Sequence, residues 1–440
     1  MKIDICHHGV DNQKDGTREV LPSSDKSSEN NHPHSETATF NRKLCFKIFR
    51  NFVLRFLRGF ANGTLLHLGV KIVAALLRNP VRKKNIKIWQ CIFTKDTVRI
   101  ALFCALYPSI YHLLVEILSA LQKQQNGWIF GISGGLAGLS LAVLKTSTRQ
   151  TLAFFTLSRA LGSGISTLVR KGILPAVPFF EVGVFCACGS LLAYCVSSAP
   201  SYMNQSYYRT LLKWMRDYSP EKFHRLFVEP GDRFLTCQET GVHEPTCLYH
   251  AVLAYLYSLP GLAKIYLPVY LIPVFLFKRA TVMDKPMHFL QSLSKNTAMS
   301  TVFLASMISL AKGTICLLRN ISHRPPPCPA YVPLTAGAVS GLALLLERPS
   351  RRKELVLFAI PQVVYVIDNF MKGSKLCSIP KFPRGFTLLF ALSMACVMYS
   401  FEREPQSLTT LIRGVLKYFI GPRSRSSLDV SPTVCSHDVT

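Results

Sequence analysis

The chain alternates between long apolar stretches and short, mostly basic polar ones. A helix needs about 20 apolar residues to cross a bilayer. Two stretches, 64–77 and 248–277, are ambiguous, because the first is short and the second is interrupted by Pro260, Pro268 and Pro273. We expect both to be interfacial or re-entrant. Eight other stretches are expected to span, near 98–121, 128–144, 151–169, 177–198, 298–318, 331–346, 355–371 and 385–401.

One pattern of small residues occurs twice, about two hundred positions apart. Residues 134–141 read GGLAGLSL and residues 337–344 read GAVSGLAL, and each copy runs into a basic turn and a second apolar stretch. Small residues four apart let two helices approach closely, within one bundle or between copies in a homo-oligomer. We predict that helices pack at Gly127, Gly131, Gly134, Gly135, Gly138, Gly337 and Gly341.

These patterns predict an all-α fold, a multi-pass integral membrane helical bundle built from two internal repeats of about four spans each. The polar N-terminus has no apolar core and is not a signal peptide. Six segments follow: a disordered polar tail (1–41), a basic amphipathic helix (42–60), a first membrane repeat (61–215), a polar linker that begins a Cys/His-containing region (216–246), a second repeat (247–420) and a disordered tail (421–440).

Composition and charge support a membrane protein. Hydrophobic residues are 49% of the chain and charged residues 17%, whereas soluble proteins are about a quarter charged. The net charge of +27 does not indicate nucleic-acid binding, because the basic residues flank apolar segments. Basic residues at such positions interact with the anionic leaflet of a membrane. The expected contacts with lipid or partners are Lys43, Lys47, Arg50, Arg58, Lys145, Arg149, Arg348, Arg351, Arg352 and Lys353.

Topology and one alternative follow from the same charges. With eight spans, the side that holds both termini collects more Lys and Arg, which predicts cytosolic termini. The basic helix 42–60 either lies on the bilayer surface or packs on the bundle.

Four soft ligands lie close together in the polar linker: Cys237, His243, Cys247 and His250. Their types suit zinc, but their spacing matches no familiar site. A metal site and a structured turn that contains Pro245 are the two interpretations, and no cofactor is expected by default. Other cysteines, Cys316 among them, lie in apolar stretches, where a free thiol acts as a small hydrophobe.

Few charges interrupt the apolar stretches. Glu116, Glu181, Asp368, Arg159 and Lys312 are the candidates, and the last two lie far from span ends. Such residues in a membrane indicate structural or lipid contacts, or a transport path. Because hydrolase, zinc-protease and nucleotide-binding motifs are absent, no enzyme activity is expected.

Three stretches resemble a known family. Residues 133–161 look like the signature hairpin of the transmembrane protein 135 family, also called peroxisomal membrane protein 52. Residues 347–352 resemble that family's other hairpin turn. Residues 243–247 and 263–272 resemble its cysteine-rich region, here at the start of the second half, so the halves stand in swapped order.

The resemblance covers residues 55–215 and 237–420. It implies a protein of mitochondrial and peroxisomal membranes. Such a protein regulates the balance of mitochondrial fission and fusion through a dynamin-related fission GTPase, and it also acts in peroxisome organisation and lipid metabolism. It brings no catalytic residues. The alternative function is a transporter or channel for lipids, metabolites or polypeptides.

Overall fold

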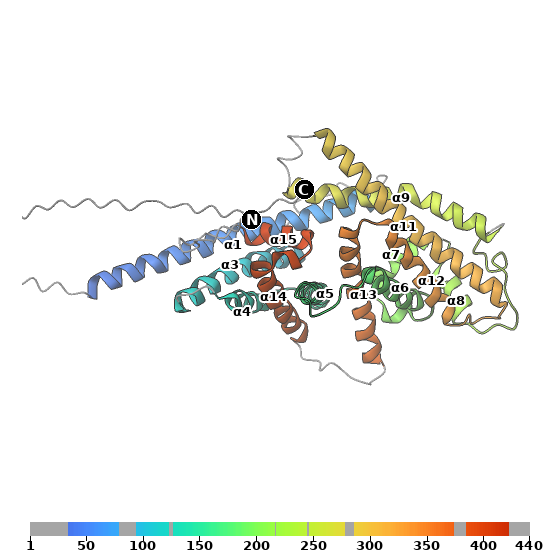
Figure 1. Ribbon diagram of the computed structural model, residues 1–440, viewed down its shortest axis with the longest axis horizontal. Coiled ribbons are helices and arrows are strands. Elements are labelled where there is room, and N and C mark those ends of the chain that lie inside the picture. Colours follow the sequence, from blue (N-terminus) through green and yellow to red (C-terminus); the bar gives the residue numbers. More distant parts are fainter. Residues whose placement is uncertain are drawn as a thin grey trace, which may run out of the picture. The chain divides into compact units, whose positions relative to one another are not determined.

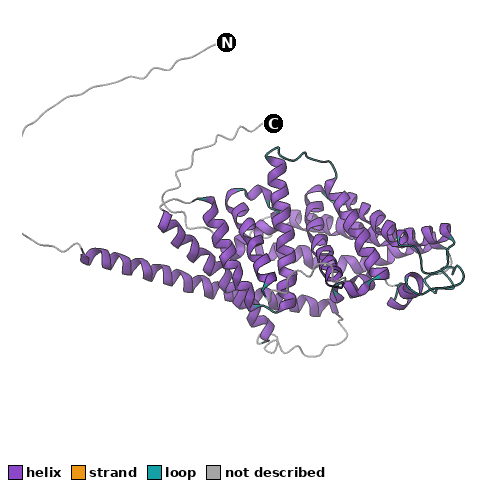
Figure 2. Cartoon of the chain, turned by 90° about the horizontal axis from the view of Figure 1, so that it is seen from below, coloured by secondary structure: helices purple, strands orange, loops and turns teal. Residues whose placement is uncertain are grey.

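Every regular element among the described residues of the computed structural model is a helix, which confirms the all-α prediction (Figure 2). The structure describes residues 34–78, 94–122, 126–215, 217–243, 246–277, 286–373 and 384–421. Two compact units divide the chain, Met1–Phe49 and Arg50–Thr440. The described part of the first unit is the beginning of helix α1, and all packing below belongs to the second.

Seven helices in the described residues are long and apolar enough to cross a membrane, so the chain has the character of a multi-pass membrane protein. They are α3 (Lys95–Gln122), α5 (Thr146–Arg170), α6 (Phe180–Ser198), α9 (Cys247–Phe277), α11 (Pro286–Ser322), α13 (Pro349–Gly373) and α14 (Gly385–Arg403).

Two shorter apolar helices end in a 3-10 turn, and the remaining elements are polar or amphipathic. The short pair comprises α4 (Gly127–Gly138) with η1 (Leu139–Val143), and α12 (Tyr331–Gly341) with η3 (Leu342–Leu346). The others are α1 (His34–Arg78), η2 (Pro200–Tyr202), α7 (Gln205–Met215), α8 (Pro220–Phe227), η4 (Pro405–Ser407) and α15 (Thr410–Ile420).

The second ambiguous stretch corrects our prediction. Residues 247–277 form one helix through Pro260, Pro268 and Pro273, not a re-entrant or broken segment. A proline removes one backbone hydrogen bond, and membrane helices tolerate this loss where neighbouring groups satisfy the freed carbonyl. The long-helix set therefore includes α9, whereas the predicted spans 128–144 and 331–346 fold as the two short helices.

The N-terminal boundaries also differ from those predicted. Helix α1 begins at His34, inside the expected disordered tail, and continues to Arg78 without a break at residue 60. Its middle packs on α3, because Cβ atoms at Gly59 and Gly63 would lie 2.6 and 2.7 Å from atoms of Cys104. Glycine is therefore used for close approach here, not for a turn, and 64–77 is no separate segment. Residues 1–33 and 422–440 lie outside the described residues.

The two halves present the same elements in the same order. Helices α4 and α12 have 12 and 11 residues, η1 and η3 have 5 each, α5 and α13 have 25 each, and α6 and α14 have 19 each. The following elements, η2 with η4 and α7 with α15, match at 3 and 11 residues.

The glycine-rich helices pack across the halves. Helix α4 lies against α14, and α12 lies against α6 (Figure 1). A Cβ atom at Gly134 would lie 2.6 Å from Met398 Cβ. At Gly337 it would lie 2.2 Å from the carbonyl oxygen of Gly189. At Gly337 and Gly189 the helix backbones approach so closely that no side chain fits between them, whereas Gly134 leaves room for the side chain of Met398.

The other predicted packing positions lie on the same two crossings. A Cβ atom added at Gly138 would lie 2.9 Å from Ala391 Cα, and one added at Gly341 would lie 2.7 Å from Cys186 Cα. Contacts at the remaining three are looser: Gly127 faces Arg403, and Gly131 and Gly135 face Ala395.

We expect Gly189→Ala to lower the free energy of unfolding by about 1–3 kcal/mol, because the added methyl group overpacks the crossing with α12. Gly183→Ala in the same helix is the control, since a Cβ there meets nothing within 4 Å. There the better helix propensity of alanine leaves stability equal or up to ~1 kcal/mol higher. Thermal unfolding of both variants in detergent measures the difference, and equal effects would contradict the assigned packing.

Candidate functional site

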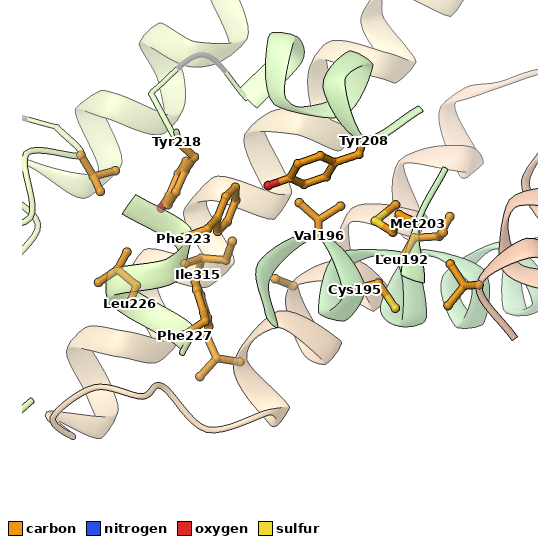
Figure 3. Close-up of a cluster of buried hydrophobic side chains, with 14 residues drawn as sticks. Leu192, Cys195, Val196, Met203, Tyr208, Tyr218, Phe223, Leu226, Phe227 and Ile315 are labelled. Atoms are coloured by element: carbon orange, nitrogen blue, oxygen red, sulfur yellow. The ribbon is translucent and has the colours of Figure 1, made fainter. Parts of the chain in front are cut away.

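The polar segment between the halves packs its aromatic side chains into a core that it shares with the bundle. Helix α8 begins with Ser219 as N-cap, whose hydroxyl accepts a hydrogen bond from Lys222 N at 3.2 Å, and Pro220 occupies the first turn. Figure 3 shows the aromatic side chains of this segment packed with residues of α6, α7 and α11. Residues 217–243 of the predicted linker therefore pack onto the bundle. The cluster includes Leu192, Val196, Tyr208, Tyr218, Phe223, Leu226, Phe227 and Ile315.

Three cysteines and a histidine converge beside this core. Cys237 and His243 come from the polar segment, Cys247 is the first residue of α9, and Cys316 lies in α11. Their ligand atoms all lie within 4.8 Å of one another. The Sγ atoms of Cys237 and Cys247 are 3.9 Å apart, and His243 Nε2 lies 3.3 Å from Cys316 Sγ. This arrangement points four soft donors at a common centre.

Hydrogen-bond donors surround the sulfur atoms. Asn320 Nδ2 donates to Cys247 Sγ at 3.2 Å, and Arg319 Nη1 approaches Cys237 Sγ at 3.8 Å. Arg319 Nη2 also donates to the carbonyl oxygen of Leu235 at 2.7 Å, and its guanidinium lies over the ring of Phe234. The segment that contains Cys237 is thereby fastened to α11.

The site favours a thiolate at Cys237. Its hydrogen bond with Cys316, helped by the charges of Arg319 and His243, lowers the pKa of the Cys237 thiol well below its usual value, although partial burial opposes this shift. A thiolate in contact with an imidazole and further sulfurs is suited to metal coordination or nucleophilic chemistry.

The cluster contains three of the four residues predicted from the sequence, and Cys316 replaces the fourth, His250. His250 stacks on His243 with ring centroids 4.3 Å apart and faces Asp217 at 3.5 Å, whereas Cys316 takes the fourth corner. Sequence reasoning passed over Cys316 because it lies in an apolar stretch. A usable signal was that Arg319 and Asn320 follow it by three and four residues, on the same helix face.

Lys312, one turn before Cys316, has an acidic partner. Its ammonium group donates to Asp217 Oδ2 at 2.6 Å, and the Lys312 side chain is 3% exposed while that of Asp217 is 35% exposed. This pair gives the intramembrane charge a structural role in holding the polar segment to α11.

The other charges in apolar helices also lie near charged or polar groups. Glu116 pairs with Arg55 at 2.8 Å, and Asp368 accepts hydrogen bonds from Lys372 and Gln150. Arg159 lines a small pocket with Lys353 and Thr409, and its Nη1 has no hydrogen-bond partner among the described residues. Glu181 begins α6.

Many of the predicted basic contact residues bind within the chain instead. Arg149 Nε donates to the carbonyl oxygen of Leu144 at 2.8 Å, and Arg352 Nε donates to that of Glu347 at 2.9 Å. Three more make contacts within the chain: Lys145 pairs with Asp96, Lys353 donates to Ser166, and Arg351 lies over the ring of Tyr270. Arg348 is half-buried, and Lys47, Arg50 and Arg58 are exposed. The side chain of Lys43 lies outside the described residues.

No protein-family model matches the chain, and no solved structure matches it. The cluster is therefore interpreted from its own geometry.

Asp217→Asn should lower the free energy of unfolding by about 2–3 kcal/mol, because it leaves the buried Lys312 ammonium without its countercharge. This is below the ~3–5 kcal/mol of a fully buried pair, since Asp217 is partly exposed. Glu239→Gln breaks the more exposed pair with Arg233 and should cost less than about 1 kcal/mol. Chemical denaturation in detergent compares them, and equal losses would argue against a structural role for Lys312.

Proposed function

We propose that this chain is a multi-pass protein of mitochondrial or peroxisomal membranes that regulates fission and fusion balance, peroxisome organisation and lipid metabolism through protein and lipid contacts. The observation that carries a membrane role is the apolar surface of the long helices. The side chains of Phe358, Leu388 and Leu392 are 51, 58 and 62% exposed. Exposing such apolar side chains to water is unfavourable, whereas contact with lipid acyl chains is not. The organelle and the fission GTPase partner rest on the family resemblance.

We further propose that the two halves arose by duplication. The matching element lengths support this proposal. A shared hydrogen bond supports it too: Arg149 donates to the carbonyl oxygen of Leu144, and Arg352 donates to that of Glu347, in each case five residues earlier. The backbone also turns alike after α6 and α14, with φ and ψ of −140° and 54° at Ala199 and −136° and 59° at Glu404. A homo-oligomer is compatible with this proposal only on another surface, because internal partners occupy the tightest glycine positions.

The lipid and partner surface is assigned to α1. Arg50 and Arg58 are exposed there beside Leu54 and Leu57, which are 57 and 59% exposed. Exposed cations next to exposed apolar side chains are the combination that binds anionic bilayers. The turn after η3 is less suited, since most of its basic side chains make internal contacts.

Both termini are proposed to be cytosolic, which needs an even number of crossings. The seven long helices and the two short ones make nine, so cytosolic termini correspond to eight crossings with α9 at the interface, where the sequence analysis placed residues 248–277. The short pair is long enough: 12 α-helical residues and 5 in a tighter 3-10 turn reach about 28 Å, close to a hydrocarbon core of about 30 Å.

The proposal is tested by tagging the chain at either end, imaging it with mitochondrial and peroxisomal markers, and treating intact organelles with protease. We expect organelle localisation and digestion of both tags. In the same cells, Arg50→Glu with Arg58→Glu should keep the localisation but weaken the effect on organelle morphology, whereas Arg50→Lys with Arg58→Lys should not. A plasma-membrane signal would count against the organelle localisation, and protection of one tag would count against two cytosolic termini. Unchanged morphology in the Glu variant would count against the role of α1.

The second candidate is a lipid carrier, favoured by a cavity of about 220 Å³ between α6, α7, α11, α12 and α13. Its walls are almost entirely apolar, with Phe185, Trp214, Met307 and Ala311 among them, and neither Arg159 nor Lys312 lines it. Such walls suit acyl chains and not ions or polar metabolites.

If the cavity carries lipid, Ala311→Phe should reduce lipid transfer in reconstituted vesicles at least several-fold by filling it. Ala298→Phe is the control, because Ala298 is exposed on the same helix. Transfer of a fluorescent lipid between vesicles is the readout. Absence of transfer by the unmodified chain, or equal transfer by both variants, would rule this candidate out.

A further inference from the structure

We propose that Cys237, His243, Cys247 and Cys316 bind one Zn²⁺ ion in a closed, structural site, which goes beyond the proposed function. A tetrahedral zinc with Zn–S of about 2.3 Å and Zn–N of about 2.0 Å separates two sulfurs by about 3.8 Å and a sulfur and a nitrogen by about 3.5 Å. The measured separations are 3.9 Å for Cys237 and Cys247 and 3.3 Å for His243 and Cys316. These two separations are close to those of a zinc tetrahedron, and all four donor atoms lie within 4.8 Å of one another.

The surroundings match the charge of such a site. Three thiolates and a neutral imidazole around Zn²⁺ leave one net negative charge, and the buried guanidinium of Arg319 lies beside Cys237. Asn320 donates to Cys247 Sγ at 3.2 Å. Donors of this kind orient thiolate ligands and moderate their charge in metal sites.

A disulfide explains the cluster less well. It would join only two of the sulfurs, and it gives no reason for the third thiol, the imidazole and the cationic donor to meet at the same place. Sulfur-rich sets of four favour zinc among the divalent metals that lack redox chemistry.

The site has a defined mechanical consequence. Its ligands come from the polar segment, from the first residue of α9 and from α11, which are separated by up to 79 residues between Cys237 and Cys316. One ion therefore closes a long loop and holds the polar segment on the bundle, next to the Lys312–Asp217 pair.

The full-length chain, purified in detergent under reducing conditions without added metal, should contain about one zinc per chain by elemental analysis. Cys316→Ser should lose most of it, whereas Cys396→Ser should retain it, because Cys396 is an exposed thiol outside the cluster. An unmodified chain with no zinc, or with iron or copper in its place, overturns the proposal. So does equal loss of zinc in the two serine variants.

Two further variants separate this ligand set from the one that the sequence alone indicated. His250→Ala should keep its zinc, and His243→Cys should keep it as a four-cysteine site, whereas His243→Ala should lose it. Loss in His250→Ala with retention in Cys316→Ser overturns the assignment of Cys316.

A measurement on the unmodified chain guards against variants that fail to fold. Cobalt substitution should give the intense visible bands of a tetrahedral ion and sulfur-to-cobalt charge-transfer absorption. The weak spectrum of octahedral cobalt overturns the proposal.

Discussion

The structure depends on the close approach of helix backbones at glycine, above all where α12 crosses α6 at Gly337 and Gly189. Within a bilayer, lipid tails are as apolar as leucine, so burial of apolar side chains gives little force to join helices. Association then relies on dispersion contacts, which are strongest where the backbones themselves meet. The second crossing, of α4 with α14, uses the same device at Gly138, which faces the backbone of Ala391.

These crossings interlock the halves. Each glycine-rich helix finds its main partner in the opposite half, and α5 and α13 meet between them. The glycine-rich helices also contact α3 and α11 of their own halves, so each is held from both sides.

The helices could be predicted from sequence because their apolar stretches have the length that a bilayer sets, and the glycine spacing identified the crossing helices. The partners could not be predicted, since spacing along one helix does not say which other helix it meets. The path of α9 through Pro260, Pro268 and Pro273 was missed because proline rules from soluble proteins overstate its cost in a bundle. Cys316 was missed for a related reason: an apolar neighbourhood along the chain does not exclude polar neighbours across space.

One face of α11 explains how the polar segment and the bundle act together. Lys312, Cys316 and Arg319 recur at intervals of four and three residues, so they form a single buried stripe. Each contacts the segment 217–243, through Asp217, His243 and Cys237 respectively. The same segment supplies Phe223, which lines the apolar cavity. Any shift of the segment along α11 would break the ion pair and the four-donor cluster together, so the shape of the cavity is coupled to polar contacts outside it.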